Sequence, residues 1–469
     1  MKYLITLLLM VFTGSLLGQT LTNELQQEIQ RRVSLQINPS IAIGVLLPDN
    51  TTQFYNFGSI NESNKQPDSL TLYEIGSVTK TFTATLTSIH LKDALHTFLP
   101  EYFSKIKNPR LDSIAIFNIR NHTAGLPRLS NQFTPKNWSD PFHGYSNAIL
   151  EAELRQLQTD TSYTWRYSNL GYSILGRTLE LATHKSYETL MGNLLETIGM
   201  KNTLLQVPQQ QLDNFAQPTN IGTTNSHWHF TGPSRYAGGL VSNTQDLLLY
   251  LKYQKETNPL FLPNLLNQLI PTGVPNLGKD KLFYKEGWFV LTPDETTQIV
   301  LHNGGTGGYI SFIGFNKKTQ VGVVVLSNSV TVVDDLGIAI LHPSFSLFHP
   351  ERTIAYELAA AIDNGDTMEL FEKYNKFKKE NYPQNIIDIY WLERFHFGKG
   401  NYRISNQLSA IMMQELPDDW EVYDIRGQNL EQLAKYDEAI TAYEKAYTMH
   451  SENEVIKEKI KRCKAKLKQ

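Results

Sequence analysis

The segment EIGSVTKTFTATL places Ser77 three residues before Lys80, and this spacing constrains the fold of the chain more than any other feature. On an α-helix, residues three apart lie on the same face, so the Lys80 amine can reach the Ser77 hydroxyl. Phe82, Leu86 and Ile89 follow at helical spacing and predict a buried helix with Ser77 at its N-terminal end. The pattern therefore predicts a nucleophilic serine beside a lysine base.

A second Ser-x-x-Lys motif occurs at Ser104 and Lys107. A chain of this length contains about two such motifs by chance, so the spacing alone carries little weight. Ser104 lies among polar residues shortly before Pro109, a pattern typical of a solvated loop end. We therefore interpret Ser104 as a surface residue and Ser77 as the candidate nucleophile.

Two further motifs follow Ser77 along the chain. The segment TWRYSNLGYSILG contains Tyr167-Ser168-Asn169, and the segment IVLHNGGTGGYISFIGF contains His302-Asn303-Gly304-Gly305. Ser-x-x-Lys, then Tyr-x-Asn, then a basic residue-x-Gly before a strand, resembles the three active-site motifs of the penicillin-recognising serine hydrolases. The resemblance is greatest to the group of class C β-lactamases, D-alanyl-D-alanine carboxypeptidases and esterases, and it covers residues 41–328.

The tyrosine motif also has two copies, because Tyr145-Ser146-Asn147 repeats the Tyr-Ser-Asn sequence. Only the later copy is followed by LGYSILG, which resembles the pattern after the family's tyrosine, so we favour Tyr167. The alternative interpretation of Tyr167 is an aromatic residue packed beside Trp165.

The resemblance implies acyl transfer through a covalent intermediate. Ser77 would attack a carbonyl carbon, Lys80 and Tyr167 would share the general-base and general-acid work, and water would then hydrolyse the acyl-enzyme. No metal or cofactor takes part in this scheme.

The substrate-binding residues implied by the resemblance are Asn169, His302, Gly304 and Gly305. Asn169 would hydrogen-bond the catalytic lysine or the substrate amide. The backbone N–H groups of the nucleophile and of Gly305 would form an oxyanion hole, and the glycines after His302 leave room for close approach of a ligand.

His302 departs from the lysine that many members of this group carry at its position. Because histidine titrates near neutrality, attraction of a substrate carboxylate would be weaker and pH-dependent, with an ionisation in kcat/KM between about pH 5.5 and 7.5. This argues against an efficient β-lactamase. An ordinary strand-end residue is the alternative interpretation.

A second departure follows Lys80, because the run to Leu99-Pro100 is several residues shorter than is usual in this group. We expect a truncated nucleophile helix or a rebuilt turn after it. Either change would alter the pocket wall without removing the catalytic atoms.

The remaining motifs do not predict another chemistry. His227-Trp228-His229 has the spacing of some zinc sites but lacks a third ligand nearby. The glycines of 304–308 lack the G-K-[ST] ending of a phosphate-binding loop, and no serine lies in a G-x-S-x-G elbow, which disfavours an α/β-hydrolase.

Composition is that of an exported globular enzyme. Of the 469 residues 41% are hydrophobic and 11% aromatic, enough for a sizeable core, and the net charge of −3 gives no basis for nucleic-acid binding. Lys2 and an apolar run to Leu17 predict a signal peptide at residues 1–18, too short for a membrane span. Cys463 is the only cysteine, so no internal disulfide can form. We expect export to the periplasm or medium of a bacterium.

Hydrophobic patterns predict an α+β fold for a hydrolase domain at residues 19–350. Leu25, Ile29 and Val33 mark a first amphipathic helix, and residues 40–60 are typical of a hairpin that turns near residues 48–50. Strands at 309–315 and 321–327 are expected to join that hairpin in one antiparallel sheet. A helical region would pack against the sheet, with the active site between them.

Beyond about residue 350 glycines become rare and lysine, glutamate and tyrosine become frequent. This stretch resembles a tetratricopeptide repeat at Gly427, Tyr436, Ala439, Tyr443 and Ala446, with a degenerate copy 34 residues earlier at Tyr402 and Ser405. We expect an all-α tetratricopeptide-like domain at residues 351–469 that recruits a protein partner. A generic helical bundle is the alternative.

Two functions fit these observations. The first is an exported serine hydrolase acting on a small-molecule or peptide substrate with an amide or ester bond, such as a peptidoglycan peptide, a D-amino-acid amide, a β-lactam or a short ester. The second is an inactive relative that binds a partner through its repeat region. Retention of Ser77, Lys80 and Tyr167 favours the first.

Overall fold

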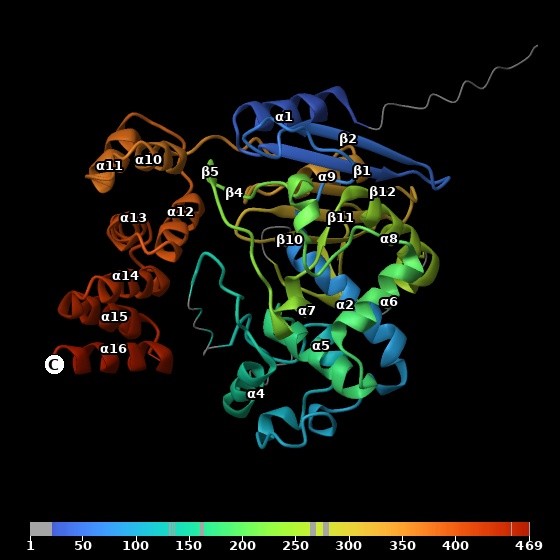
Figure 1. Ribbon diagram of the computed structural model, residues 1–469, viewed down its shortest axis with the longest axis horizontal. Coiled ribbons are helices and arrows are strands. Elements are labelled where there is room, and N and C mark those ends of the chain that lie inside the picture. The colour runs from blue at the N-terminus through green and yellow to red at the C-terminus, as the bar shows by residue number, and fades with distance from the viewer. Residues whose placement is uncertain are drawn as a thin grey trace, which may run out of the picture.

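The computed structural model describes residues 21–468 apart from 131–132, 134, 136, 160–163, 263–268, 275–280 and 452. The predicted signal peptide at 1–18 lies outside these residues. A sheet with its helices occupies one side of the molecule, and a column of C-terminal helices occupies the other (Figure 1). Within the described part of the chain, none of the helices has both the length and the apolar composition needed to cross a bilayer.

One antiparallel sheet organises the larger part. Among the described residues its strands follow the order β2-β1-β12-β11-β10-β9-β8-β7. Their bounds are β1 (Ser40–Leu46), β2 (Thr52–Gly58), β7 (Ile270–Pro271), β8 (Leu282–Lys285), β9 (Trp288–Leu291), β10 (Ile299–Gly305), β11 (Ile310–Asn316) and β12 (Gly322–Ser327). β1 pairs with β12, with Ile43 opposite Val325. The predicted hairpin, and the sharing of one sheet by N-terminal and C-terminal strands, are therefore confirmed.

Shorter strands and the helices connect and cover this sheet. The short pairs are β3 (Tyr73–Glu74) with β6 (Val241–Ser242), and β4 (Thr219–Asn220) with β5 (Thr223–Thr224). The helices before residue 350 are α1 (Asn23–Ser34), α2 (Thr79–His90), α3 (Ile116–Arg120), α4 (Asn147–Gln156), α5 (Asn169–Thr183), α6 (Tyr187–Ile198), α7 (Arg235–Gly238), α8 (Thr244–Thr257) and α9 (Asp334–Leu341). Short 3₁₀ turns are η1 (Gly76–Val78), η2 (Lys92–Ala94), η3 (Leu99–Glu101), η4 (Pro109–Leu111), η5 (Gln209–Asn214), η6 (Gly232–Ser234) and η7 (Pro259–Phe261).

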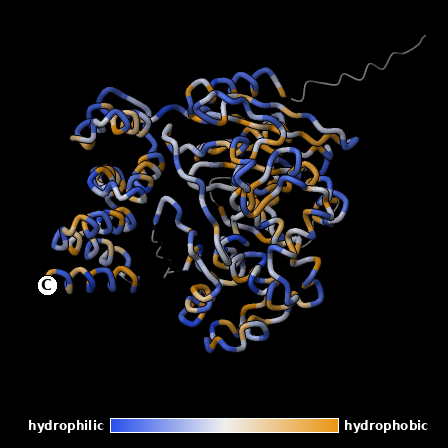
Figure 2. The backbone as a smooth tube through the Cα atoms, viewed as in Figure 1, coloured by the Kyte–Doolittle hydropathy of each residue, from blue (hydrophilic) through white to orange (hydrophobic). Residues whose placement is uncertain are grey.

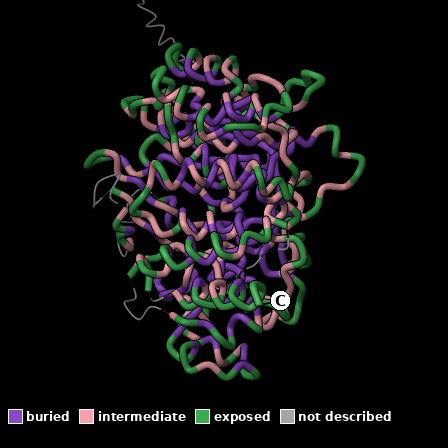
Figure 3. The backbone as a smooth tube through the Cα atoms, turned by 90° about the vertical axis from the view of Figure 1, so that its left-hand side faces the viewer, coloured by how far each residue is buried: buried purple, intermediate pink, exposed green. Residues whose placement is uncertain are grey.

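The sheet separates two apolar layers. On one face, α1 and α9 pack against side chains such as Ile43 and Val325, and on the other face α2, α5, α6 and α8 form the larger core with Ala42 and Val324. This alternation of faces is the period of two expected of a strand buried on both sides. Apolar residues gather where these layers meet, and buried residues lie inside with exposed ones at the margin (Figures 2 and 3).

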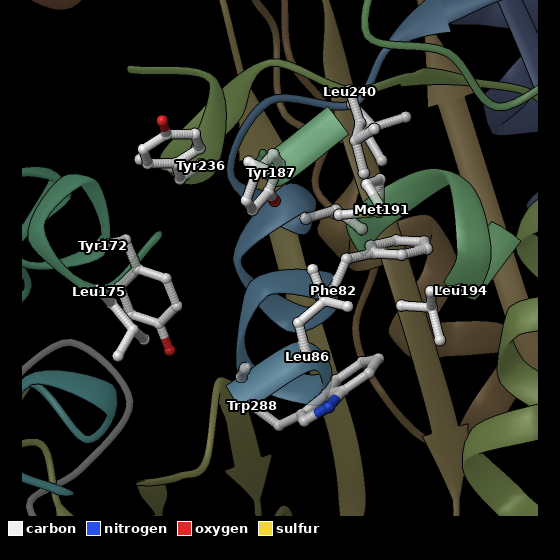
Figure 4. Close-up of a cluster of buried hydrophobic side chains, with 14 of the residues drawn as sticks. Phe82, Leu86, Tyr172, Leu175, Tyr187, Met191, Leu194, Tyr236, Leu240 and Trp288 are labelled. Atoms are coloured by element: carbon white, nitrogen blue, oxygen red, sulfur yellow. The ribbon is translucent and has the colours of Figure 1, made fainter. Parts of the chain in front are cut away.

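Helix α2, which follows Ser77, runs through the larger core. Phe82 and Leu86 point among Trp288, Met191 and neighbouring apolar side chains (Figure 4). Threonine is a poor helix former, but here the hydroxyls donate to carbonyls one turn earlier, as at Thr81, Thr85 and Thr87. The prediction that Ile89 is buried is wrong, since its side chain is 50% exposed. The reason is that α2 ends at His90, where the helix leaves the core and a 3₁₀ turn follows.

The C-terminal region is helical throughout its described elements. These are α10 (Ile354–Asp363), α11 (Leu370–Lys379), α12 (Ile386–Gly398), α13 (Tyr402–Glu415), α14 (Trp420–Gln432), α15 (Tyr436–Met449) and α16 (Glu454–Lys466). A Cβ at Gly427 would lie 2.5 Å from the ring of Tyr443, so this glycine allows α14 and α15 to pack closely. The assignment as tetratricopeptide repeats stays a prediction.

Candidate active site

Ser77 lies in the 3₁₀ turn η1, which continues directly into α2. Gly76 has a φ of +47°, a backbone conformation that side chains disfavour, and it turns the chain from β3 into the helix. The serine is partly exposed, while the helix behind it is buried. The sequence prediction of a serine at the start of a buried helix is therefore confirmed.

Lys80 lies in the first turn of α2 and is fully buried. Its Nζ donates to Ser77 Oγ at 2.9 Å and to the carbonyl oxygen of Ala237 at 2.7 Å. Burial, and then the positive charge of Arg128, holds the pKa of Lys80 well below the ordinary value of a lysine. A neutral amine at this position can accept the proton of the serine hydroxyl.

Tyr167 lies two residues before the start of α5 and faces the nucleophile. Ser168 Oγ caps α5 by accepting from Gly171 N at 2.8 Å, and the Ser168 N–H donates to His122 Nδ1 at 3.1 Å. The centroid of the His122 ring lies 4.5 Å from that of Tyr167, which restricts the tyrosine ring. Tyr167 shares a side-chain hydrogen bond with Ser77, and burial raises the pKa of Tyr167 to about 12. The tyrosine is therefore a protonated phenol at neutral pH.

The end of β10 packs directly against η1. A Cβ on Gly304 would lie 2.1 Å from the carbonyl oxygen of Ile75 and 2.8 Å from Ser77 N, and a Cβ on Gly76 would lie 2.8 Å from Gly305 N. Glycine alone permits two backbones to approach this closely. The backbone nitrogens of Ser77 and Gly305 consequently lie on adjoining segments, as a two-donor oxyanion hole requires.

Asn169 is the first residue of α5 and lines a cavity beside Ser77. Its backbone N–H donates to the carbonyl oxygen of Arg128 at 2.9 Å. Its Oδ1 is buried and receives no hydrogen bond from any residue that the structure describes, Lys80 included. The sequence predicted either Lys80 or a substrate amide as the hydrogen-bond partner of Asn169. Because Lys80 does not bond to it, a substrate amide is the partner that we expect.

His302 lies in the middle of β10 and is fully buried. Its Nδ1 donates to the carbonyl oxygen of Asn303 at 2.6 Å, and its ring centroid lies 5.2 Å from that of Phe289. Burial, followed by the charge of Lys80, lowers the pKa of His302 to about 3. The histidine is therefore neutral at neutral pH, which argues against the ionisation in kcat/KM between pH 5.5 and 7.5 predicted from the sequence. The packing of aromatic residues that shields His302 from water comes from other segments, so the His-x-Gly motif alone does not reveal it.

Two cavities meet at Ser77. The first, which we call the aromatic cavity, has a volume of about 240 Å³, and the second, the β10 cavity, has about 620 Å³. The aromatic cavity is lined by Ser77, Asn169, Trp138, Phe142, Trp228, Phe230, Tyr390 and Trp391. The β10 cavity is lined by Ser77, Tyr167, Asn303, Gly305 and Asp334. Arg128 and Trp391 line both.

Arg128, a lining residue that sequence reasoning missed, supplies positive charge at this junction. Its guanidinium carbon lies 5.4 Å from the centroid of the Tyr167 ring. Arg128 directly follows the segment RNHTAGLP at residues 120–127, which resembles the residues that surround the pocket in the penicillin-recognising hydrolases. That position is the feature of the sequence that could have identified Arg128. Tyr390 and Trp391 were also missed, and they carry no local signal because α12 is distant in the sequence from the three active-site motifs.

Asp334, another residue missed from the sequence, lies at the start of α9 beside the β10 cavity. Its Oδ2 accepts from Asn303 Nδ2 at 2.6 Å. Burial raises the pKa of Asp334 to about 7. The group at this site whose pKa lies near neutrality is therefore the carboxyl of Asp334 and not the imidazole of His302.

The duplicate motifs have other partners. Ser104 and Lys107 are exposed, and Lys107 Nζ donates to the Ser104 carbonyl oxygen at 3.1 Å rather than to its hydroxyl. The Tyr145 hydroxyl donates to Glu153. His227 Nδ1 lies 2.9 Å from the Tyr309 hydroxyl, whereas His229 Nδ1 lies 2.8 Å from Asp140 Oδ2, so the two histidines of the H-x-H motif have different partners.

Comparison with known proteins places this geometry in a family. The sequence model of the beta-lactamase family matches residues 25–341. A beta-lactamase of Providencia stuartii is 31% identical over 231 residues, which cover 46% of this chain and 55% of that protein. A beta-lactamase of Lysobacter lactamgenus is 25% identical over 352 residues (66% and 88%), and protein flp of Staphylococcus aureus strain MW2 is 26% identical over 334 residues (66% and 64%).

Solved structures share the fold. A class C beta-lactamase superposes with a TM-score of 0.58 at 20% identity, covering 69% of this chain and 96% of that one. The beta-lactamase/D-alanine carboxypeptidase of Pseudomonas syringae superposes with a TM-score of 0.57 at 20% identity, covering 68% and 99%. With the family match over residues 25–341, these findings show that the chain belongs to the beta-lactamase family of serine hydrolases.

Proposed function

We propose that the protein hydrolyses an amide or ester bond through an acyl-enzyme formed on Ser77. The observation that carries this proposal is the contact of the Ser77 hydroxyl with both Lys80 and Tyr167. The directions of the two pKa shifts favour opposite roles, because a neutral lysine accepts a proton and a protonated phenol donates one.

In the proposed reaction Ser77 Oγ bonds to the substrate carbonyl carbon while Lys80 Nζ takes its proton. The negative charge on the carbonyl oxygen is stabilised by the backbone N–H groups of Ser77 and Gly305. The bond to the leaving group then breaks as the Tyr167 hydroxyl protonates that group, and the Lys80 ammonium gives its proton to the resulting Tyr167 phenolate. Water attacks the ester carbon of the acyl-enzyme as Lys80 Nζ takes one of its protons, and the Lys80 ammonium then gives that proton to Ser77 Oγ as the ester bond breaks. Asn169 Oδ1 would accept from a substrate N–H.

The substrate classes proposed for this site are a peptidoglycan peptide, a D-amino-acid amide, a β-lactam and a short ester. The names of the relatives, which include beta-lactamases and a D-alanine carboxypeptidase, support this range. We further propose export, on the predicted signal peptide at 1–18, and a division into a hydrolase domain at 19–350 and a tetratricopeptide-like region at 351–469.

The mass of the intact protein after brief mixing with a penicillin or an activated nitrophenyl ester tests the proposal. We expect a mass increase equal to one acyl group, located by peptide mapping on the segment that contains Ser77. A penicillin adduct that persists would favour a penicillin-binding peptidase, and ester turnover without it would favour an esterase, an amidase or a fast β-lactamase. Acylation of another residue, or no reaction with either reagent, would contradict the proposal.

The titration of Asp334 leads to a prediction for anionic substrates. Above about pH 7 the ionised carboxylate repels a substrate carboxylate in the β10 cavity, so kcat/KM for an anionic ester should fall as the pH rises through this value. Asp334→Asn should remove the fall, whereas His302→Gln should leave it unchanged. Rate profiles from pH 5 to 9 with an anionic ester and a matched neutral one measure this. A fall that disappears in His302→Gln but survives in Asp334→Asn would assign the titration to the histidine instead.

Arg128 should influence the base as well as the substrate. Its positive charge lowers the pKa of Lys80, so Arg128→Gln should raise that pKa and move the acidic limb of kcat/KM to higher pH. We expect the limb to move to higher pH, because removal of the nearby positive charge makes the Lys80 ammonium easier to form. The profile is measured with a neutral ester, and Arg155→Gln, an exposed arginine of α4 outside both cavities, is the control. An unmoved or lowered limb in Arg128→Gln would contradict this effect.

A further inference from the structure

The aromatic cavity is built from two distant parts of the chain. Phe142, Trp228 and Phe230 come from loops of the sheet-containing part, whereas Tyr390 and Trp391 come from α12. Arg394 of α12 also lines it, and residues 390, 391 and 394 share one helix face through the i, i+3 and i, i+4 spacings. The C-terminal helical region therefore supplies one wall of the cavity that reaches Ser77.

Helix α12 is held against the sheet-containing part by tight contacts. A Cβ on Gly398 would lie 2.4 Å from Ser139 N, so only glycine allows the end of α12 to approach that loop. The guanidinium carbon of Arg394 lies 5.6 Å from the centroid of the Trp138 ring. The carbonyl oxygen of Trp391 accepts from Asn220 Nδ2 at 3.4 Å.

A shared apolar core fixes the same helix from behind. Ile37 and Ile221 of the sheet-containing part are buried in one cluster with Ile389 and Leu392 of α12. Burial of these apolar side chains stabilises the contact, so the wall that α12 provides is part of the folded structure.

The wall contributed by α12 is apolar in character. The guanidinium of Arg394 is paired with the buried carboxylate of Glu393, with Nη2 at 2.7 Å from Oε1. Its charge is thereby compensated within α12, and the aromatic residues Tyr390 and Trp391 supply the rest of this wall. Flat aromatic walls favour aromatic or other planar apolar groups through stacking.

The position of Tyr167 distinguishes the two cavities. This proposed proton donor to the leaving group lines the β10 cavity and not the aromatic cavity. A leaving group in the β10 cavity places the acyl part of the substrate on the other side of Ser77, among the aromatic rings.

We infer that α12 makes the C-terminal helical region part of the substrate site, and that Trp391 selects substrates with an aromatic acyl group. This inference rests on the proposed acyl-enzyme function and names the substrate class of that same site: an amide or ester of an arylacetyl-type acid.

Matched esters test the selection. We measure kcat/KM for 4-nitrophenyl phenylacetate and 4-nitrophenyl acetate with the full chain, with Trp391→Ala and with Trp391→Phe. Trp391→Ala should lower the value for the phenylacetate about tenfold or more and that for the acetate less than about threefold, since an apolar contact in a pocket discriminates on this scale. Trp391→Phe, which keeps a ring, should recover much of the preference.

Trp420→Ala is the control for damage to the helical region. Trp420 is the first residue of α14 and, like Trp391, is partly exposed. Its ring stacks on His450 at the end of α15, and it lines neither cavity. Trp420→Ala should leave the ratio of the kcat/KM values for the two esters unchanged. Equal losses for both esters in Trp391→Ala, or the same change of ratio in Trp420→Ala, would overturn the inference.

A binding measurement separates this inference from the proposed function. Calorimetry with the neutral amide N-phenylacetylglycinamide and Ser77→Ala protein requires no turnover, and adding Trp391→Ala should weaken the affinity about tenfold or more. If the native protein hydrolysed neither ester, the proposed function would fail, yet weaker binding in the double variant would still support the cavity. Binding that is undetectable, or that Trp391→Ala does not weaken, would overturn the inference about α12 and Trp391.

Discussion

Turnover of a nitrophenyl ester is expected to fall by at least about four orders of magnitude when Ser77 is replaced by alanine. The hydroxyl is the atom that Lys80 and Tyr167 both contact, so its removal leaves the base and the acid without a nucleophile to serve. Initial rates under saturating ester, together with the unfolding temperature of each protein, measure the effect. Stability should change little because Ser77 is partly exposed.

The second Ser-x-x-Lys motif offers a matched control. Ser104 carries the same spacing to Lys107 but is exposed and does not contact the lysine through its hydroxyl. Ser104→Ala should therefore retain the native rate within about twofold, as is usual for surface substitutions. A Ser77→Ala protein that kept more than a tenth of the native rate would exclude Ser77 as the nucleophile.

Gly304→Ala is expected to lower kcat by about two to three orders of magnitude, the cost of losing an oxyanion-hole donor. The new Cβ would lie 2.1 Å from the carbonyl oxygen of Ile75 and 2.8 Å from Ser77 N, so β10 and η1 must move apart. The atoms displaced are backbone atoms, which cannot turn aside as a flexible side chain can. Single-turnover rates of acylation would locate the loss in the chemical step.

A glycine in open space serves as the comparison. Gly192 lies on α6, where a Cβ would meet nothing within 4 Å. Gly192→Ala should keep native kcat and raise stability by up to about 1 kcal/mol, because alanine favours a helix over glycine. Native kcat in a folded Gly304→Ala protein would show that the approach of β10 to Ser77 does not form the oxyanion hole.

Local periodicity predicted the regular parts of this fold. Alternating residues gave the β1–β2 hairpin, and the apolar runs before residue 328 gave β11 and β12, since strand and helix periods depend on near neighbours in sequence. The same reasoning failed at Ile89, which continues the helical spacing of apolar residues but has an exposed side chain. A period shows which face a residue lies on, not whether another element covers that face.

The catalytic pair was readable because its geometry is local. Ser77 and Lys80 lie one helical turn apart, so their spacing in sequence determines their distance in space. The pKa of His302 was not readable from the sequence, because it depends on burial by residues from other strands and on the charge of Lys80. The motif identified the residue, whereas its pKa belongs to the folded surroundings.

The sequence by itself determined the Ser77–Lys80 contact, the candidates Tyr167, Asn169, Gly304 and Gly305, and the α+β class. The tertiary structure alone decided that Arg128, Asp334 and Trp391 border the site, and that α12 walls it. The physical reason is that backbone hydrogen bonding and helical spacing act over a few residues. Cavity walls and electrostatic fields instead arise from segments that only folding brings together, here more than 300 residues apart between Ser77 and Trp391.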